Sequence, residues 1–355
     1  MISIVLGTRP EIIKLSPIVR ALDEIEYFIV HTNQHYSENM DRVFFEELNL
    51  PEPKYNLNVG SGNHGEQTGK MLINIEKVLL KEKPKVVIVQ GDTNSTLSGA
   101  LAASKLHIRV AHVEAGLRSY DKRMPEEINR ILTDHISDYL FAPTEIAKEN
   151  LIKEGIEENK IFVVGNTIVD ATLQNLKIAE KVIKDFDLED YFLLTLHRAE
   201  NVDNRERLKK IVEGILEVSE VYEKDIIFPI HPRTKKKLKE FNLFDKLKDN
   251  ERIKIINPVG YLKFLMLEKN AELILTDSGG VQEEACILKV PCITLRDNTE
   301  RPETIKVGAN ILVGANKEKL IKAISVMLNK KRDWENPFGD GKSGERIVKI
   351  LREEL

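Results

Sequence analysis

The stretch LILTDSGGVQEEA, residues 273–285, passes from a short apolar run into a serine, two glycines and then two glutamates. The apolar run favours a buried strand, and the next residues are typical of a helix that begins after Ser278. The amide groups of Gly279 and Gly280 would then face outward, where no Cβ keeps a phosphate away. Glu284 would project one turn further along the same face, and its carboxylate could accept hydrogen bonds from two hydroxyls. This pattern suits a nucleotide, whereas the simpler alternative is a capped helix with solvated glutamates.

The alternation of a short apolar run with a longer stretch of helical period continues along the chain. The clearest helical stretches are residues 11–25, 66–83 and 205–222. The predicted strands are residues 2–6, 27–31, 85–90, 109–113, 139–142, 160–164, 191–196, 225–230, 252–256, 272–276, 291–295 and 310–313. Because strands that alternate with helices form parallel sheets covered on both faces, the pattern predicts an α/β fold. We expect two doubly wound Rossmann-like domains, residues 1–170 and 171–340, that face each other across a cleft.

Composition excludes several classes of protein. The chain has 355 residues, 42% of them hydrophobic, and a formal net charge of -4, so we expect no nucleic-acid partner. No apolar run approaches the roughly 18 residues of a membrane helix, so no membrane partner is expected. Cys286 and Cys292 lie in apolar segments, which favours a reducing compartment and provides no metal site. The opening MISIVLGTRPE lacks a basic leader, and a cytoplasmic protein is therefore expected.

Polar residues follow many of the predicted strands. In doubly wound sheets, ligands bind beyond the carboxyl ends of the strands. The residues found there are Arg9, Asp92, Glu114, His197, Arg198, His231, Arg233, Asp277, Ser278 and Arg296. Any one of them could be an ordinary solvated loop residue, but so many at corresponding edges favour a ligand site in the cleft. The literal dinucleotide motif GSGNHG (60–65) does not follow the first strand, and the DFD triplet (185–187) lies in a charged junction, so we expect neither to bind a ligand.

Seven blocks together carry a resemblance to a known family. They are GTRPEIIKLSP (7–17), QGDTNSTL (90–97), HVEAGLRS (112–119), MPEEINR (124–130), LHRAEN (196–201), TDSGGVQEEA (276–285) and RDNTERPE (296–303). In order and spacing the chain resembles the non-hydrolysing UDP-N-acetylglucosamine 2-epimerases from residue 2 to about residue 340. The resemblance implies a GT-B fold, a C-terminal helix within residues 341–355 that crosses back to the first domain, a homodimer, and no cofactor.

The resemblance also implies a reaction and residues for it. The family interconverts UDP-GlcNAc and UDP-ManNAc by eliminating UDP to give 2-acetamidoglucal and adding UDP back. Asp92, Glu114 and Glu126 match the catalytic carboxylates, and His197 matches a histidine near the diphosphate. The residues that match contacts to the UDP-sugar are Arg9, Lys14, His231, Val259, Phe264, Ser278, Gly279, Gly280, Glu284 and Arg301. Which carboxylate acts as base stays open.

Several alternatives remain at this stage. Glu126 and Arg130 are also spaced for a structural i, i+4 ion pair, and Phe264 could serve only core packing. A hydrolysing 2-epimerase that releases ManNAc and UDP, or a GT-B glycosyltransferase, would use a similar site. Tyr36 and Ser37 depart from the arginine and amide that many bacterial members carry after the second strand, so activation by UDP-GlcNAc is expected to be weaker or differently built.

Overall fold

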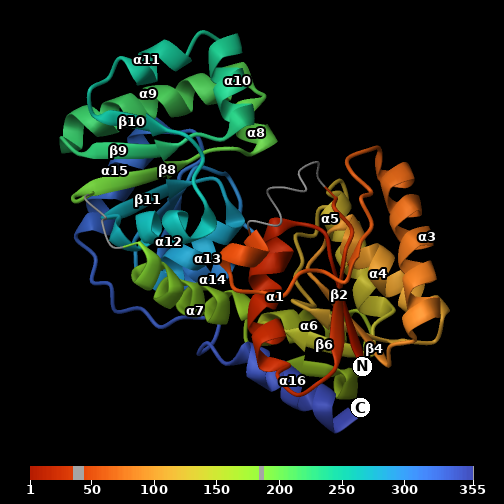
Figure 1. Ribbon diagram of the computed structural model, residues 1–355. Helices are drawn as coiled ribbons and strands as arrows, with labels where there is room; N and C mark the ends of the chain where they lie inside the picture. Colours follow the sequence, from red (N-terminus) through yellow and green to blue (C-terminus); the bar gives the residue numbers. More distant parts are fainter. Residues whose placement is uncertain (35–43, 184–187, 355) are drawn as a thin grey trace. The chain divides into compact units, whose positions relative to one another are not determined.

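The computed structural model describes residues 1–34, 44–183 and 188–354, and the chain divides into two units (Figure 1). Unit 1 comprises Met1–Asn175 and Phe338–Leu355, and unit 2 comprises Leu176–Pro337. Tyr36, Ser37 and the DFD triplet lie outside the described residues.

Unit 1 contains a parallel sheet in the order β3-β2-β1-β4-β5-β6-β7. Its strands are β1 (Ile2–Leu6), β2 (Tyr27–His31), β3 (Tyr55–Asn56), β4 (Val86–Gln90), β5 (Arg109–Val113), β6 (Tyr139–Ala142) and β7 (Ile161–Val163). Its helices are α1 (Arg9–Ala21), α3 (His64–Glu82), α4 (Asn94–Lys105), α5 (Pro125–His135), α6 (Glu145–Lys153), α7 (Thr167–Val182), which continues into unit 2, and α16 (Ser343–Glu354). The strand order reverses between β1 and β4, and the loops that follow these strands therefore diverge and leave room for a ligand.

Unit 2 repeats this plan with a parallel sheet in the order β10-β9-β8-β11-β12-β13. Its strands are β8 (Tyr191–Thr195), β9 (Asp225–Pro229), β10 (Ile253–Ile256), β11 (Leu273–Thr276), β12 (Cys292–Thr294) and β13 (Asn310–Leu312). Its helices are α8 (Ala199–Val202), α9 (Arg205–Tyr222), α10 (Pro232–Glu240), α11 (Phe244–Lys248), α12 (Tyr261–Asn270), α13 (Gly279–Leu288), α14 (Pro302–Lys306) and α15 (Lys317–Leu328). Here the order reverses between β8 and β11.

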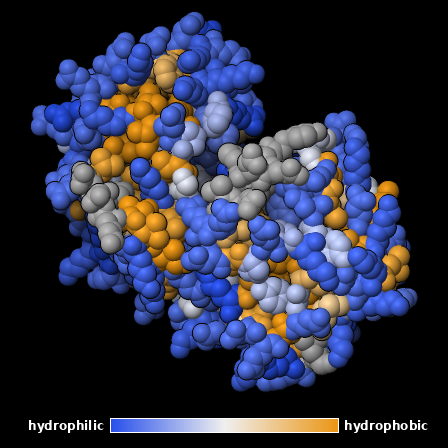
Figure 2. Space-filling view, in the orientation of Figure 1, coloured by the Kyte–Doolittle hydropathy of each residue, from blue (hydrophilic) through white to orange (hydrophobic). Residues whose placement is uncertain are grey.

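Apolar side chains on both faces of each sheet form the cores. All five residues of β1 and of β8 are buried, as expected for central strands with helices on both sides. In unit 2, residues of α9 and α15 cover one face, and residues of α12 and α13 cover the other. The face shown in Figure 2 is mostly hydrophilic and has several hydrophobic patches. Burial of this apolar area, at roughly 25 cal/mol per Å², is the main force that holds each unit together.

The C-terminal helix α16 packs against α1. The contact is close, because a Cβ on Gly344 would lie 2.9 Å from the carbonyl carbon of Pro17. The amide of Gly344 donates a hydrogen bond to Asp170 Oδ1 at 2.9 Å. The helix α16 is therefore part of the folded body of unit 1.

The predicted fold class is confirmed, since both units are doubly wound α/β structures. Every strand predicted from the sequence is present, and the first part of the GSGNHG motif is a loop before α3. The sequence analysis missed β3. This strand has only two residues and lies at the sheet edge, so it carries no apolar alternation that could reveal it.

Candidate functional site

Two predicted catalytic carboxylates follow neighbouring strands of unit 1. Asp92 comes two residues after β4, and Glu114 comes directly after β5. Gly91 between β4 and Asp92 has a φ of 76°, a conformation that favours glycine. A Cβ on Gly91 would lie only 3.7 Å from Glu114 Oε2. At the carboxyl ends of β4 and β5, the loop that carries Asp92 therefore lies against the Glu114 carboxylate.

The Glu114 carboxylate is buried and held by three side chains. Lys14 Nζ lies 2.6 Å from Oε1, Asn166 Nδ2 donates to the same oxygen at 3.3 Å, and Gln90 Nε2 donates to Oε2. Glu114 also has a φ of 70°, which is uncommon for a residue with a side chain. Backbone strain of this kind is frequent where a side chain must be aimed, and here it directs a carboxylate into an ion pair with Lys14.

Asp92 is held by α5. Arg130 forms ion pairs with Asp92 and with Glu127, the latter at 2.8 Å, and Asn129 Nδ2 donates to the Asp92 carbonyl at 2.9 Å. Burial would raise the pKa of Glu127, but hydrogen bonds from the amides of Ser119 and Tyr120 and from Arg130 outweigh it and lower the pKa. Arg130 therefore connects a buried, ionised structural carboxylate to the predicted catalytic one.

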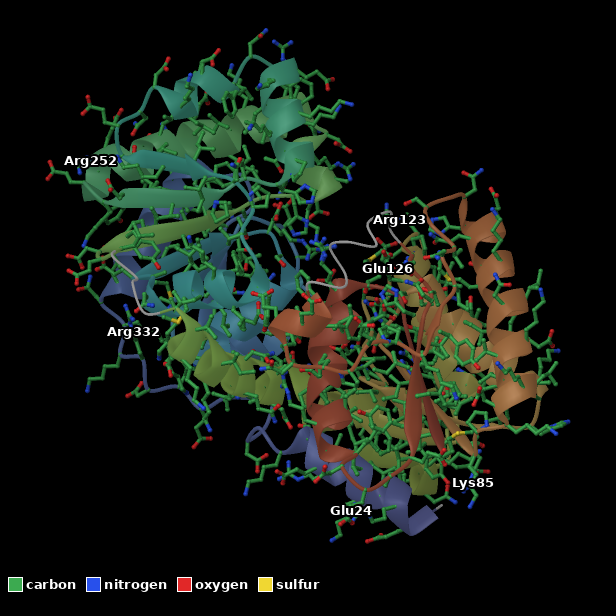
Figure 3. All side chains as sticks on the ribbon, viewed as in Figure 1. Glu24, Lys85, Arg123, Glu126, Arg252 and Arg332 are labelled. Carbon is green, nitrogen blue, oxygen red and sulfur yellow. The ribbon has the colours of Figure 1, made fainter. Side chains whose placement is uncertain are left out.

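The third carboxylate, Glu126, is exposed in the first turn of α5, directly after Pro125, and Figure 3 shows its position. It precedes Asn129 and Arg130 by about one helical turn, so one helix carries it together with the residues that hold Asp92. Arg9 is half-buried at the start of α1, with its guanidinium carbon 4.9 Å from the centre of the Phe44 ring. Lys14 lies on the same helix one turn further along.

In unit 2, α13 begins as the sequence predicted. Ser278 is the N-cap residue, but its hydroxyl does not accept a hydrogen bond from its own helix. A Cβ on Gly279 would lie 3.8 Å from its nearest neighbour, Arg198 Nη2, and a Cβ on Gly280 would lie 4.0 Å from Ser278 Oγ. Both distances are ordinary contacts. The packing of the protein therefore does not require glycine here, and the glycines leave space in front of the helix dipole for an anion.

Arg198 faces this helix start and was absent from the predicted binding residues. Its Nε is buried and has no hydrogen-bond partner among the described residues. A buried guanidinium nitrogen without an acceptor is costly, unless a ligand provides one. The signal in the sequence was its position directly after His197 at a strand end.

Asp277 fixes the loop that carries His197 and Arg198. Its fully buried carboxylate accepts hydrogen bonds from the amide of His197 at 3.0 and 3.1 Å and from the amide of Arg198 at 2.9 Å. Asn201 Nδ2 donates to it at 3.1 Å. Asp277 thus positions the backbone of His197 and Arg198, two residues that could bind a diphosphate.

His197 and His231 lie near each other, with ring centres 5.8 Å apart. Burial is the main cause that lowers the pKa of His197, and the positive charge of Arg198 acts in the same direction, while Asp277 opposes both. Burial and Arg233 also lower the pKa of His231. The protein alone therefore favours the neutral form of both imidazole rings, whereas a bound anion would favour the protonated forms.

Glu284 and the residues predicted beside uracil lie on α13 and around α12. Tyr261 Oη donates to Glu284 Oε1 at 2.9 Å. Val259 and Phe264 are half-buried and pack against the core of α12 and α13. Packing and a ring contact are both compatible with this position of Phe264.

Arg301 is an ion-pair partner within the protein. Its Nε lies 2.6 Å from Oε1 of the fully buried Glu283, so this edge of the guanidinium is already used. Nearby, Arg296 binds Glu300, whose carboxylate lies close to the position of a Cβ on Gly279. The start of α13 therefore lies near two ion pairs, Arg301–Glu283 and Arg296–Glu300, as well as near Arg198.

The acid stability of the protein should depend on Glu300. Burial would raise the pKa of Glu300, but the hydrogen bonds and charge of Arg296 outweigh it and lower the pKa to about 2. A carboxyl with a lowered folded-state pKa stabilises the protein above its unfolded-state value, near 4.5, and this contribution disappears as the pH falls toward 2. We expect a loss of about 3 kcal/mol in the free energy of unfolding across that window, measured by urea titration. In Glu300→Gln this part of the pH dependence should vanish; an unchanged profile would contradict the assignment.

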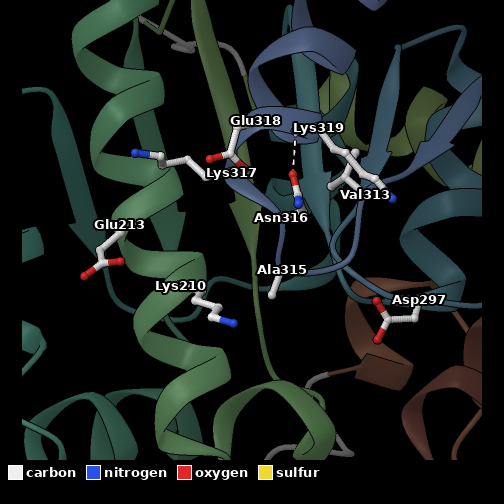
Figure 4. A pocket seen from close by; sticks show the side chains of 9 residues that line it. All are labelled: Lys210, Glu213, Asp297, Val313, Ala315, Asn316, Lys317, Glu318 and Lys319. Atoms are coloured by element: carbon white, nitrogen blue, oxygen red, sulfur yellow. Dashed lines mark hydrogen bonds between the residues drawn. The ribbon is translucent and has the colours of Figure 1, made fainter.

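A cavity of about 450 Å³ lies elsewhere in unit 2, between α9 and the start of α15 (Figure 4). Its lining mixes three lysines with three acids, and Asn316 in its wall caps α15 by accepting a hydrogen bond from the Lys319 amide at 2.7 Å. None of the predicted site residues lines it.

Within the described ranges, no cluster of three or more His, Cys, Asp or Glu side chains could hold a metal ion, and no helix is long and apolar enough to cross a bilayer. Cys286 and Cys292 are buried free thiols, and burial raises the pKa of Cys286 to about 12.

Comparison with known proteins identifies the family. The sequence model of the UDP-N-acetylglucosamine 2-epimerase family matches residues 19–352. The chain is 80% identical to the UDP-N-acetylglucosamine 2-epimerase of Methanocaldococcus jannaschii, covering 99% of this chain and 98% of that protein. It is 65% identical to the enzyme of the same name from Methanococcus maripaludis, with the same coverage. The crystal structure of the M. jannaschii UDP-GlcNAc 2-epimerase in complex with UDP-GlcNAc and UDP matches with a TM-score of 0.91 at 79% identity and 99% coverage of both chains. The chain therefore belongs to the UDP-N-acetylglucosamine 2-epimerase family of isomerases.

Proposed function

We propose that the protein reversibly converts UDP-GlcNAc to UDP-ManNAc by eliminating UDP and adding it back. The observation that carries this proposal is the pair of carboxylates at adjacent strand ends of unit 1, Asp92 and Glu114, each bound to a cation. Inversion at a carbon requires a group that removes a proton on one face and a group that supplies one on the other, and ionised carboxylates can serve as the base. The names of the relatives support the choice of substrate.

Epimerisation at C2 requires a leaving group in addition to a base. C2 of the sugar has no adjacent carbonyl, so its proton is not acidic enough for direct enolisation. A carboxylate takes the C2 proton, the C–H electron pair forms a C1–C2 double bond, and the C1–O bond breaks to release UDP. Return of a proton to the opposite face of C2 and attack of the UDP oxygen on C1 give the epimer. The balance involves no oxidation or reduction, so we expect no cofactor.

The groups at the start of α13 suit the departing diphosphate. Arg198 faces Gly279 with a buried Nε that has no partner among the described residues, and the helix N-terminus carries a partial positive charge. Negative charge that develops on the leaving group would raise the pKa of His197 and so favour its protonated form. The other proposed contacts to the UDP-sugar are Arg9 and Lys14 of α1, His231 and Arg301. Val259 and Phe264 would flank the uracil.

Glu284 is proposed to bind the ribose hydroxyls, and its removal should weaken UDP binding. In Glu284→Ala we expect a loss of about 1–3 kcal/mol, because charge-assisted hydrogen bonds to the diol disappear. Isothermal titration with UDP measures this loss. Glu318→Ala, which replaces an exposed glutamate in the first turn of α15, is the control variant. An unchanged dissociation constant in Glu284→Ala would return Glu284 to a structural role.

Proton NMR of the purified protein with UDP-GlcNAc in deuterated water tests the proposed reaction. No NAD, metal ion or sugar acceptor is added. UDP-ManNAc that carries deuterium at C2 is expected. Free ManNAc with UDP would instead identify a hydrolysing enzyme, and no turnover without an acceptor would favour a glycosyltransferase. The cytoplasmic location and the homodimer stay predictions, and light scattering measures the latter.

A further inference from the structure

Glu268 is a fully buried carboxyl group that no predicted role uses. It lies in the last turn of α12, and both of its carboxylate oxygens are out of contact with water. Its side chain lies near the carboxyl group of Glu284 on α13. Glu284 itself is nearly buried and accepts a hydrogen bond from Tyr261 Oη at 2.9 Å. Two carboxyl groups therefore share one apolar environment behind the proposed ribose contact.

Glu268 has no hydrogen-bond donor from the residues that the structure describes, since no N–H or O–H group among them donates to either of its oxygens. The other titratable groups that face it are Tyr191 of β8 and Cys292 of β12. Tyr191 donates its hydroxyl hydrogen to the carbonyl of Leu267 at 2.7 Å, and neither group provides a positive charge. Two neighbouring buried carboxyl groups repel each other when both are ionised, and a proton kept by one of them removes this repulsion and provides a donor to the other.

We propose that Glu268 is a neutral carboxylic acid whose O–H donates to Glu284 and, together with Tyr261 Oη, fixes the Glu284 carboxylate as the acceptor for the ribose diol. Glu268 is thus a positioning residue for the nucleotide. This inference rests on the proposed role of Glu284. Its physical basis is that two donors hold the carboxylate in one orientation, so the lone pairs that remain point in fixed directions.

Protonation of Glu268 makes nucleotide binding sensitive to alkaline pH. Burial is the main cause that raises the pKa of Glu268 well above its ordinary value, and the charge of Glu284 acts in the same direction. Loss of this proton at high pH places two negative charges against each other and removes a donor to Glu284. The affinity for UDP should therefore be complete while Glu268 is protonated and should fall as the pH rises through its pKa.

Two substitutions separate the proton from the packing. Glu268→Gln keeps the shape and an N–H donor but cannot ionise, so UDP affinity near neutral pH should be retained and the Glu268-dependent alkaline decline should be lost. Glu268→Met fills the same space without a donor. It should weaken UDP binding by about fivefold to thirtyfold and reduce the preference for UDP over 2′-deoxy-UDP, which reports on the diol. The uracil titrates equally in all variants, so the difference from wild type isolates Glu268.

Infrared spectroscopy of the protein without nucleotide provides a readout that does not depend on binding. The carbonyl absorption of protonated carboxylic acids should be stronger in the wild type than in Glu268→Gln, so the difference spectrum should contain one such band. Absence of this difference would overturn the proposal, as would unchanged UDP affinity and diol preference in Glu268→Met. If Glu268→Met does not fold, the pH profile of Glu268→Gln still decides the question. If the wild type does not bind UDP, the proposed function and the ribose role of Glu284 both fail. The infrared difference still reports whether Glu268 is protonated, so the two failures can be told apart.

Discussion

Replacement of Glu114 by glutamine is expected to lower kcat by about a hundredfold or more and to leave the UDP dissociation constant close to the wild-type value. The amide has nearly the same shape but cannot accept a proton from C2 or return one. UDP binding should survive because most of the proposed UDP residues, among them Ser278 and Glu284, belong to unit 2, whereas Glu114 follows β5 of unit 1. Steady-state kinetics with UDP-ManNAc and titration with UDP measure the two quantities separately.

Asp92→Asn and Glu126→Gln should likewise lower kcat and leave the UDP dissociation constant close to the wild-type value. Glu127→Gln is the matched control for Glu126→Gln, because Glu127 is buried and binds Arg130 and two backbone amides. It should mainly lower the free energy of unfolding. Near wild-type turnover in Asp92→Asn, Glu114→Gln or Glu126→Gln would remove that residue from the catalytic set.

The sequence predicted the fold well because central strands of parallel sheets are continuous apolar runs. All five residues of β1 and of β4 are buried, and each strand contains only one polar residue, Ser3 or Gln90, so the type of both strands can be seen without a structure. The edge strand β3 has only the partly buried Tyr55 and the exposed Asn56, and its pairing depends on β2 rather than on its own composition. Local pattern cannot reveal an element whose stability comes from its neighbour.

The candidate site was predictable where a residue stands directly at a strand or helix end. Asp92, Glu114 and Ser278 have such positions, and the structure places them there. The residues that orient them come from distant parts of the chain. Asn166, which binds Glu114, follows β7, and Asp277, which holds the loop of His197, follows β11. These contacts join residues 52 and 80 positions apart, so no local spacing could indicate them.

Arg130→Met should have the largest effect on stability. Arg130 is almost fully buried between Asp92 and Glu127, and its removal leaves the buried Glu127 carboxylate without its cation. Breaking a buried ion pair by deleting one partner costs about 3–5 kcal/mol, so we expect the free energy of unfolding to fall by that amount in urea titrations. Turnover should fall too, because Asp92 loses the side chain that orients it.

The double variant Arg130→Met with Glu127→Gln separates the loss of stability from the loss of turnover. Neutral glutamine removes the buried charge, so a substantial part of the lost stability should return in a double-mutant cycle. The Ser119 and Tyr120 amides, which donate to Glu127 at 2.9 and 2.8 Å, would still find an acceptor in the glutamine carbonyl. Turnover should not return, since the orientation of Asp92 depends on the guanidinium and not on the charge of Glu127. Full recovery of both stability and kcat in the double variant would show that Arg130 only neutralises Glu127 and has no part in positioning Asp92.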